Sequence, residues 1–162
     1  MHRATWNSAL AAGFAKATAV AAVLTLLFTM DTSALDFEVH APCYWAETGV
    51  QVEKGRRYRV QIVDMSTVKD ASIEVKDLEG WPPGWQRIVF SPVAWLRRRP
   101  LEPWFSLIAT VDRKQPRRLQ EGAIYEAPAT GQLVCFFNDA FWAYGNNQGC
   151  GKFRLVPVAG GR

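Results

Sequence analysis

The sequence predicts an all-β protein, a single small β-sandwich of the jelly-roll type, preceded by an N-terminal hydrophobic helix. Short apolar runs separated by Gly, Pro, Asn and Asp recur about every ten residues from Asp36 onward, which is the pattern of sandwich strands. No segment in this part has a sustained helical period, so helices contribute little to the expected domain. Residues 17–30 carry no charge, and they predict the separate hydrophobic helix.

This apolar segment indicates export. Residues 1–34 are predicted to be a signal peptide or an N-terminal membrane anchor, and residues 35–162 the folded domain. The apolar run has the length of a signal-peptide core, but if Lys16 extends its ammonium to the interface, residues 8–30 are long enough to span a bilayer. Both alternatives place the domain outside the cytoplasm, either periplasmic, secreted or anchored to an inner membrane.

The clearest strand is 58–63, where Tyr58, Val60 and Ile62 alternate with polar residues and so give one buried and one wet face. The Pro-rich segments 81–85 and 92–104 are predicted loops, the second with at most one helical turn. The remaining predicted strands are 36–40, 49–52, 72–75, 87–90, 105–111, 123–126, 132–138 and 152–158.

The formal net charge of +4 is a weak bias. The run Arg97–Arg99 is interpreted either as a solvated loop or as a face for phosphate or anionic lipid. Nucleic acid is not an expected partner, because the chain has an export signal and no motif for binding RNA or DNA. With three cysteines at least one stays unpaired: Cys135 is expected in the core, and Cys43 and Cys150 are the candidate disulfide.

Catalysis has little support in the sequence, and we expect no enzyme. His40 is the one histidine outside the targeting segment, and its place at a strand end suggests a structural residue. The spacing of His and Cys does not match a zinc motif. Four acidic residues interleaved with lysines could pair for glycoside hydrolysis, but they are better interpreted as the solvated face of an edge strand and its turn: Asp70, Glu74, Asp77 and Glu79.

The informative segment is 137–149, FNDAFWAYGNNQG, which begins where a clear strand ends. It places the carboxylate of Asp139 ahead of Asn146 and Asn147, which lie between two glycines. Oxygen ligands on a sharply turning backbone suit a hard cation such as calcium. The same residues also suit a polar hairpin loop, because Asn and Gly tolerate positive φ. Spacing alone leaves both interpretations open.

The segment resembles the calcium- and sugar-binding loop of the PA-I-like galactophilic lectins, which are small bacterial β-sandwiches with a galactose-binding-like fold. A weaker outline also agrees with that family, namely TGVQVEKG before the strand 58–63, FSLIATV in the middle and APATGQL before the site. The resemblance thus covers most of residues 37–158, but only this loop is specific. The matching positions are Asn138, Asp139, Tyr144, Gly145, Asn146, Asn147 and Gly149.

The resemblance implies calcium-dependent carbohydrate binding. Calcium (Ca²⁺) would be bound by the side chains of Asp139, Asn146 and Asn147 and by the carbonyl of Ala143. The sugar would contact Asp139, Ala140, Trp142 and Asn146. The chemistry implied is binding rather than turnover.

The chain departs from the family at two places. Ala143 replaces a threonine, and segment 92–104 contains neither the histidine nor the glutamine that contacts galactose in the family. The alternative function is therefore a metal-free envelope module that contacts a protein or an anionic surface through Arg97–Arg99, Trp95 and Trp104. The stretch RRRPLEPWFSLI also resembles a module appended to secreted bacterial lipase-like effectors, which would link such a module to secretion.

Overall fold

The structure is a computed structural model that describes residues 33–159. The predicted targeting segment, residues 1–34, lies outside the described residues except for its last two positions. Within residues 33–159, no helix has the length and apolar character needed to cross a bilayer.

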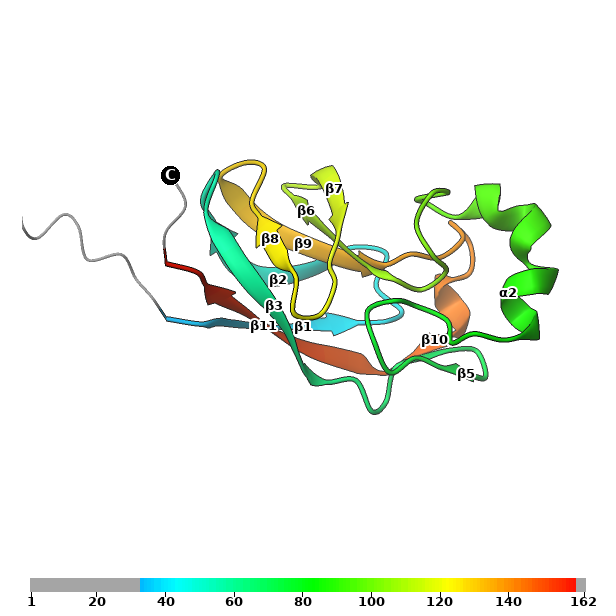
Figure 1. The fold of residues 1–162 in the computed structure, drawn as a ribbon. Coiled ribbons are helices and arrows are strands. Elements are labelled where there is room, and N and C mark those ends of the chain that lie inside the picture. Colours follow the sequence, from blue (N-terminus) through cyan, green and yellow to red (C-terminus); the bar gives the residue numbers. More distant parts are fainter. Residues whose placement is uncertain (1–32, 160–162) are drawn as a thin grey trace, which may run out of the picture. The chain divides into compact units, whose positions relative to one another are not determined.

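Two four-stranded antiparallel sheets face each other, which confirms the predicted all-β sandwich (Figure 1). The first sheet has the order β1 (Leu35–His40), β11 (Cys150–Pro157), β3 (Arg57–Asp64), β8 (Ile124–Glu126). The second has the order β2 (Ala46–Val52), β9 (Gly131–Phe137), β6 (Leu107–Val111), β7 (Lys114–Arg118). First and last strands of the described chain pair directly, because β1 lies against β11.

The core lies between the sheets, as the alternating sequence predicts. On β3, Tyr58 and Val60 are buried while Arg59 and Gln61 are exposed. At the end of β9, the ring of Phe137 stacks on that of Phe105 with centroids 5.0 Å apart. Buried apolar residues of both sheets form one core cluster, and Phe137 ends β9 within it.

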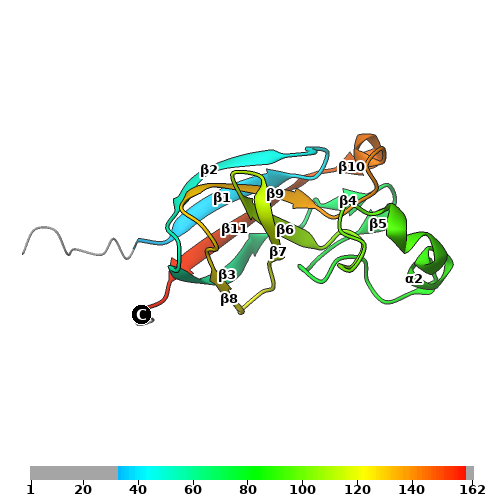
Figure 2. The same ribbon diagram turned by 90° about the horizontal axis from the view of Figure 1, so that it is seen from above.

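A third, small sheet closes the end of the sandwich opposite the C-terminal end of β11 (Figures 1 and 2). Its order is β10 (Asn147–Gln148), β4 (Lys69–Asp70), β5 (Ile73–Glu74), and the short helix η2 (Tyr144–Asn146) leads into it. Pairing of β10 with β4 sets Asn147 opposite Asp70. Two polar segments that are distant in sequence are thus brought together at this end.

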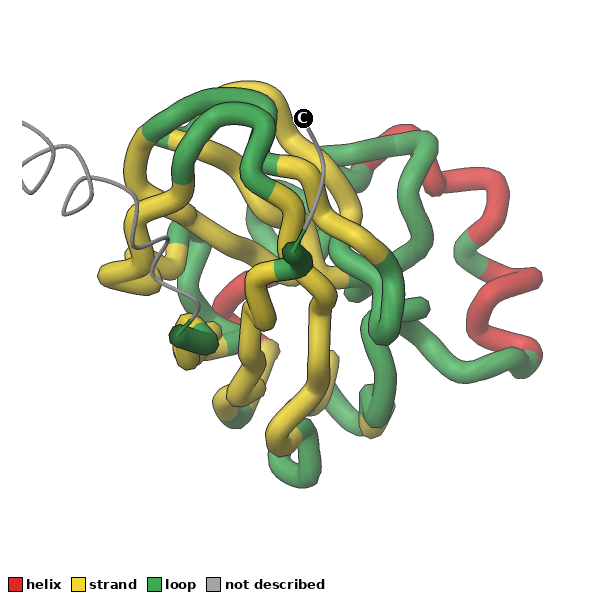
Figure 3. The backbone as a smooth tube through the Cα atoms, turned by 60° about the vertical axis from the view of Figure 1, so that its left-hand side comes forward, coloured by secondary structure: helices red, strands yellow, loops and turns green. Residues whose placement is uncertain are grey.

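The predicted strand 87–90 is wrong, because a helix, α2 (Trp85–Val89), lies there and is followed by η1 (Ser91–Leu96), as Figure 3 shows. Its β-branched residues have no strand to pair with; Ile88 and Val89 are exposed. Strand β7 was not predicted. Its sequence KQPRR has a central proline and three charges, and such a sequence is not typical of a strand.

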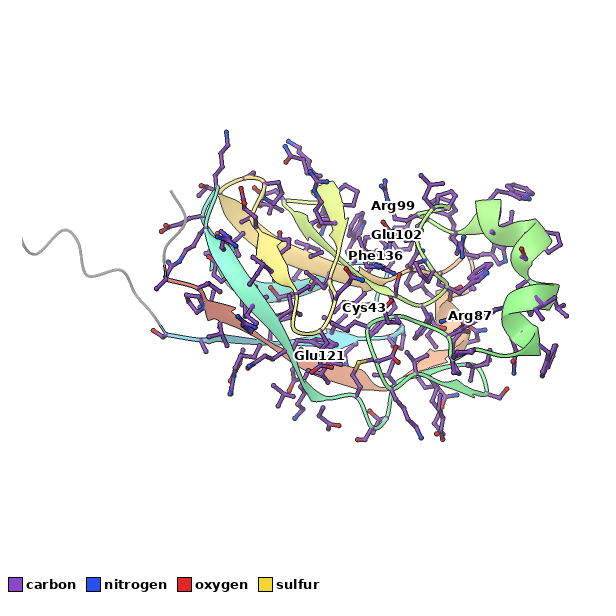
Figure 4. All side chains as sticks on the ribbon, viewed as in Figure 1. Cys43, Arg87, Arg99, Glu102, Glu121 and Phe136 are labelled. Carbon is purple, nitrogen blue, oxygen red and sulfur yellow. The ribbon has the colours of Figure 1, made fainter. Side chains whose placement is uncertain are left out.

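The predicted disulfide between Cys43 and Cys150 is also wrong, because all three cysteines are free. Cys43 packs against the core, near the centre of Figure 4. The Cys150 thiol instead faces Glu38, whose carboxylate oxygen lies 3.7 Å away. The Cys43 side chain thus faces the core, while the Cys150 thiol lies beside an exposed carboxylate. Cys135 is fully buried, as expected.

Candidate functional site

The site begins where β9 ends, and Asn138 fixes that point. Its amide nitrogen donates to the carbonyls of Arg99, Glu102 and Pro103 at 3.0, 3.1 and 3.0 Å. Its amide oxygen accepts from the backbone N–H of Arg99 at 2.9 Å. Arg99 and Glu102 lie on the loop leading towards β6 (Figure 4). One fully buried side chain therefore holds the loop of residues 99–103 against the end of β9.

The next residue, Asp139, is 2% exposed. Its carboxylate accepts the backbone N–H of Ala140 at 2.7 Å and the amide N–H of Asn147 at 3.0 Å. Burial raises the pKa of Asp139, and these two hydrogen bonds oppose the rise. The carboxylate is thus held in one orientation by donors from both ends of its own loop.

Asp70 is a second buried carboxylate at the same end. It is 5% exposed and accepts the indole N–H of Trp81 at 2.8 Å. Burial and the negative charge of Asp139 raise the pKa of Asp70 to about 6, against the lowering effect of the Trp81 hydrogen bond. Two acidic groups are therefore close enough to repel each other in a poorly solvated place.

No cation from the described part of the chain forms an ion pair with Asp70 or Asp139. Beside them, the buried amide oxygen of Asn147 has no hydrogen-bond partner among the described residues. Buried acceptors of this kind are normally satisfied, because an unpaired one costs about 1–3 kcal/mol. The oxygens of these three side chains form an acceptor-rich cluster that fits a hard cation.

A pocket of about 380 Å³ opens next to this cluster. Its polar end is formed by Asp70, Asp139 and Asn146. Its walls are aromatic, and the rings of Trp81 and Trp104 stack at 5.2 Å with an interplanar angle of 12°. The other aromatic residues of the wall are Trp85, Phe90 and Trp142. A few polar groups beside aromatic faces are typical of small-molecule sites.

A glycine allows the stacked tryptophans to approach. Gly80 has φ +87°, and a Cβ on it would meet the carbonyl oxygen of Trp104 at 2.0 Å. The N–H of Trp81 donates to this same carbonyl at 2.9 Å. The backbones at Trp81 and Trp104 are therefore hydrogen-bonded to each other, which fixes the two stacked rings in the pocket wall.

Most of the residues predicted for metal and sugar binding line this pocket: Asp139, Ala140, Trp142, Ala143 and Asn146. Asn147 lies behind the pocket, buried against Asp139. The carbonyl of Ala143 accepts the N–H of Asn146 at 3.1 Å and keeps a second lone pair. The structure therefore brings together the residues that the sequence pattern singled out.

The architecture has a counterpart among solved structures. It is similar to a domain described as "EclA N-terminal domain; PllA-like lectin", with a TM-score of 0.51 and 17% sequence identity, covering 76% of this chain and 96% of that chain. The fold is lectin-like. At this identity the likeness speaks for the fold alone. A scan against protein-family models and a search of curated proteins both found no match.

Within this lectin-like fold, two residues of the arginine run pack against aromatic rings. The Arg98 guanidinium lies among aromatic rings, 3.5 Å from the Phe136 centroid and 3.8 Å from that of Tyr44, and donates to the Tyr144 hydroxyl at 2.9 Å. Arg97 lies over the ring of Trp104, 5.2 Å from its centroid. Both cations are thus half-buried against aromatic rings of the protein rather than fully solvated.

The two tryptophans of the alternative function, Trp95 and Trp104, differ in exposure. Trp104 is 8% exposed, so the expectation that it offers an exposed contact is wrong. Trp95 is 69% exposed, as that hypothesis requires. Trp104 lines the pocket, with Trp81 stacked on its ring and Arg97 5.2 Å from its ring centroid.

Sequence reasoning missed Asp70 and the aromatic wall. Asp70 was placed on a solvated face because charged residues surround it; Lys69 and Glu74 do form an exposed ion pair at 3.3 Å. The sequence signal for Asp70 is its spacing, because it lies two residues after the apolar Val68 and residues two apart on a strand face the same side. In the structure both side chains are buried. Asp70 is buried because β4 pairs with β10, and the local sequence of residues 65–75 carries no information about that pairing.

Proposed function

We propose that this protein is a binding module for carbohydrate and that binding depends on calcium held at the end of β9. The observation that carries the proposal is the pair of buried carboxylates, Asp70 and Asp139, beside the unpartnered amide oxygen of Asn147. A bound calcium ion would neutralise the pair and offer coordination positions to hydroxyl groups. The lectin-like fold supports a binding role.

The side-chain oxygens of Asp70, Asp139, Asn146 and Asn147, with the Ala143 carbonyl, would supply the protein ligands. Asp70 goes beyond the set implied by the sequence resemblance. Calcium takes six to eight oxygens, so sugar hydroxyls and water would complete the set. Asp139 is already oriented by Ala140 and Asn147, which lowers the cost of ordering the site.

The aromatic wall supports carbohydrate as the ligand class. Sugars present C–H faces that pack on aromatic rings, and their hydroxyls need oxygen and nitrogen partners at the edge. Trp142 borders the polar end of the pocket and is 69% exposed, so its ring is available to a ligand. Asn146 is exposed on the same rim and can donate or accept a hydrogen bond.

The decisive test is the thermal unfolding midpoint of the full 162-residue chain in millimolar calcium and in chelator. At about ten times the dissociation constant, calcium adds about 1.4 kcal/mol, which corresponds to about 4 °C for a domain of this size. Asp139→Asn should abolish this shift. Asp36→Asn, on an exposed strand face, is the matched control and should keep it. A wild-type chain with no calcium response would overturn the proposal in favour of a metal-free module.

Sugar binding is tested separately with a glycan panel. Retention should be lost in chelator and weakened in Trp142→Ala, while Trp142→Ala keeps the calcium shift. The variant Ile88→Ala removes another exposed apolar side chain, 76% exposed, that does not line the pocket, and it should bind as the wild type does. Equal loss in both variants would argue against a sugar contact at Trp142.

We also propose that the domain works outside the cytoplasm, either periplasmic, secreted or anchored to the inner membrane. The support is the apolar segment within residues 1–34. Extracellular calcium modules bind weakly, with dissociation constants of about 10⁻⁴–10⁻³ M, and such sites fit a calcium-rich compartment. Cell fractionation with N-terminal sequencing of the mature chain tests this, and a cytoplasmic chain that retains Met1 would contradict it.

A further inference from the structure

A second group of metal-ligating side chains lies on the outer face of the first sheet, away from the pocket. Glu38 and His40 are two residues apart on β1 and point to the same face, and His40 pairs with Cys150 on β11. One ligand atom from each of these three residues lies within 4.8 Å of the other two. None of the three lines the pocket described above.

The backbone around this cluster is firmly held. The N–H of Cys150 donates to the Thr67 hydroxyl at 3.3 Å, and the N–H of Ala41, next to His40, donates to the Gly149 carbonyl at 3.0 Å. Gly149 has φ +84°, and a Cβ there would meet the Thr67 carbonyl oxygen at 2.0 Å. The ligands are therefore carried by paired strands, which hold a site better than a free loop does.

The three donors form a set that suits zinc better than calcium. Zinc takes thiolate sulfur, imidazole nitrogen and carboxylate oxygen at about 2.0–2.3 Å, usually in a tetrahedron. Ligand atoms in such a tetrahedron are about 3.5 Å apart, so side-chain movements of about 1 Å would bring the three ligand atoms to that spacing. Two of the three residues are exposed and Cys150 is half-buried, so an ion can reach them from solvent.

We propose that Glu38, His40 and Cys150 form a zinc site on the outer face of β1 and β11, with its fourth position open to water or to a ligand atom from a partner molecule. On binding, the Cys150 thiol gives its proton to solvent and the sulfur bonds to the metal. The proposal is independent of the calcium-dependent function, because it shares no ligand with the pocket.

One neighbour competes with the metal. The Lys152 ammonium lies 3.4 Å from a Glu38 carboxylate oxygen, and both side chains are half-exposed. An exposed ion pair of this kind contributes little, so zinc can displace it. Lys152→Met removes a cation next to the site and should therefore tighten zinc binding. An ordinary surface ion pair without a metal function gives no such gain.

The test is a titration of the reduced, metal-free full chain with Co²⁺ and then with Zn²⁺. A thiolate ligand gives Co²⁺ a sulfur charge-transfer band in the near ultraviolet, and Zn²⁺ should bleach it. Cys150→Ser should remove the band, and His40→Gln should weaken zinc binding by about tenfold or more. Cys43→Ser, at the other half-buried cysteine, is the matched control and should titrate as the wild type does.

Three results would overturn the proposal: no charge-transfer band in the wild type, an unchanged band in Cys150→Ser, or equal loss in Cys43→Ser. Asp139→Asn separates the two sites. This variant should keep the cobalt band while losing the calcium response, so either site can fail without the other. Circular dichroism of each variant without metal confirms that the sandwich is folded.

Discussion

Two aspartates of this domain have opposite surroundings. Asp36, on β1, is exposed and accepts two hydrogen bonds from the Arg154 guanidinium at 2.6 and 2.8 Å, and this pairing lowers the pKa of Asp36. Asp70 is buried, faces another carboxylate and has a pKa raised to about 6. The first carboxylate is neutralised within the fold. The second has no ion-pair partner among the described residues, which is the arrangement that the proposed calcium site requires.

The largest expected effect is at Asn138, whose side-chain amide holds residues 99–103 against the end of β9. Asn138→Ala leaves three carbonyls and one N–H without their partner at a buried position, so the free energy of unfolding should fall by about 3 kcal/mol. Urea unfolding in chelator measures it. Asn146→Ala, exposed in the same loop, should change stability little in chelator. Similar losses in the two variants would show that Asn138 is no special support.

The next effect tests whether Asp70 destabilises the metal-free protein. Asp70→Asn removes a buried charge and its repulsion with Asp139, and the new side chain can still accept from Trp81. In chelator near pH 7, the free energy of unfolding should rise by about 1–2 kcal/mol. In calcium the variant should gain less than the wild type does. A variant less stable than the wild type in chelator would show that Asp70 is structural.

The pH dependence of the metal-free chain sharpens the same contrast. The pKa of Asp70 is about 6 in the folded state and near 4 in the unfolded state, so between these values the folded state holds more protons. Stability should therefore fall as pH rises from about 4 to 6, and Asp139, whose pKa is also raised, adds in the same direction. Unfolding midpoints in chelator across this range measure the fall, and Asp70→Asn should reduce it.

The smallest effect is expected on the exposed strand face. Asp36→Asn breaks a solvated ion pair, and such pairs contribute little because water already screens the charges. Its unfolding midpoint should match that of the wild type in chelator, and its calcium shift should be intact. A large loss of stability or of the calcium shift in Asp36→Asn would show that the exposed and the buried aspartate do not differ in role.

The sequence predicted the sandwich because its strands carry their own alternating pattern, as Tyr58 and Val60 show. It also singled out the loop with Asp139 and Asn147, where Asp, Asn and Gly positions are close together along the chain and where the resemblance to a lectin loop lies. Asp70 was misplaced because its burial comes from pairing with β10, more than 70 residues away. The role of Arg98 was missed in the same way, since its aromatic neighbours come from β9 and the segments around Tyr44 and Tyr144. Local patterns thus predicted strands and a loop, and long-range pairing decided which charges are buried.

The hydrogen bond from Trp81 to Asp70 has an optical consequence. Indole emission responds to nearby charge, and the Trp81 ring also stacks on Trp104 in the pocket wall. A change in the charge on Asp70 should therefore alter the fluorescence of the unlabelled protein. Occupancy of the pocket should therefore be measurable by intrinsic tryptophan fluorescence, and Trp81→Phe should lose this signal.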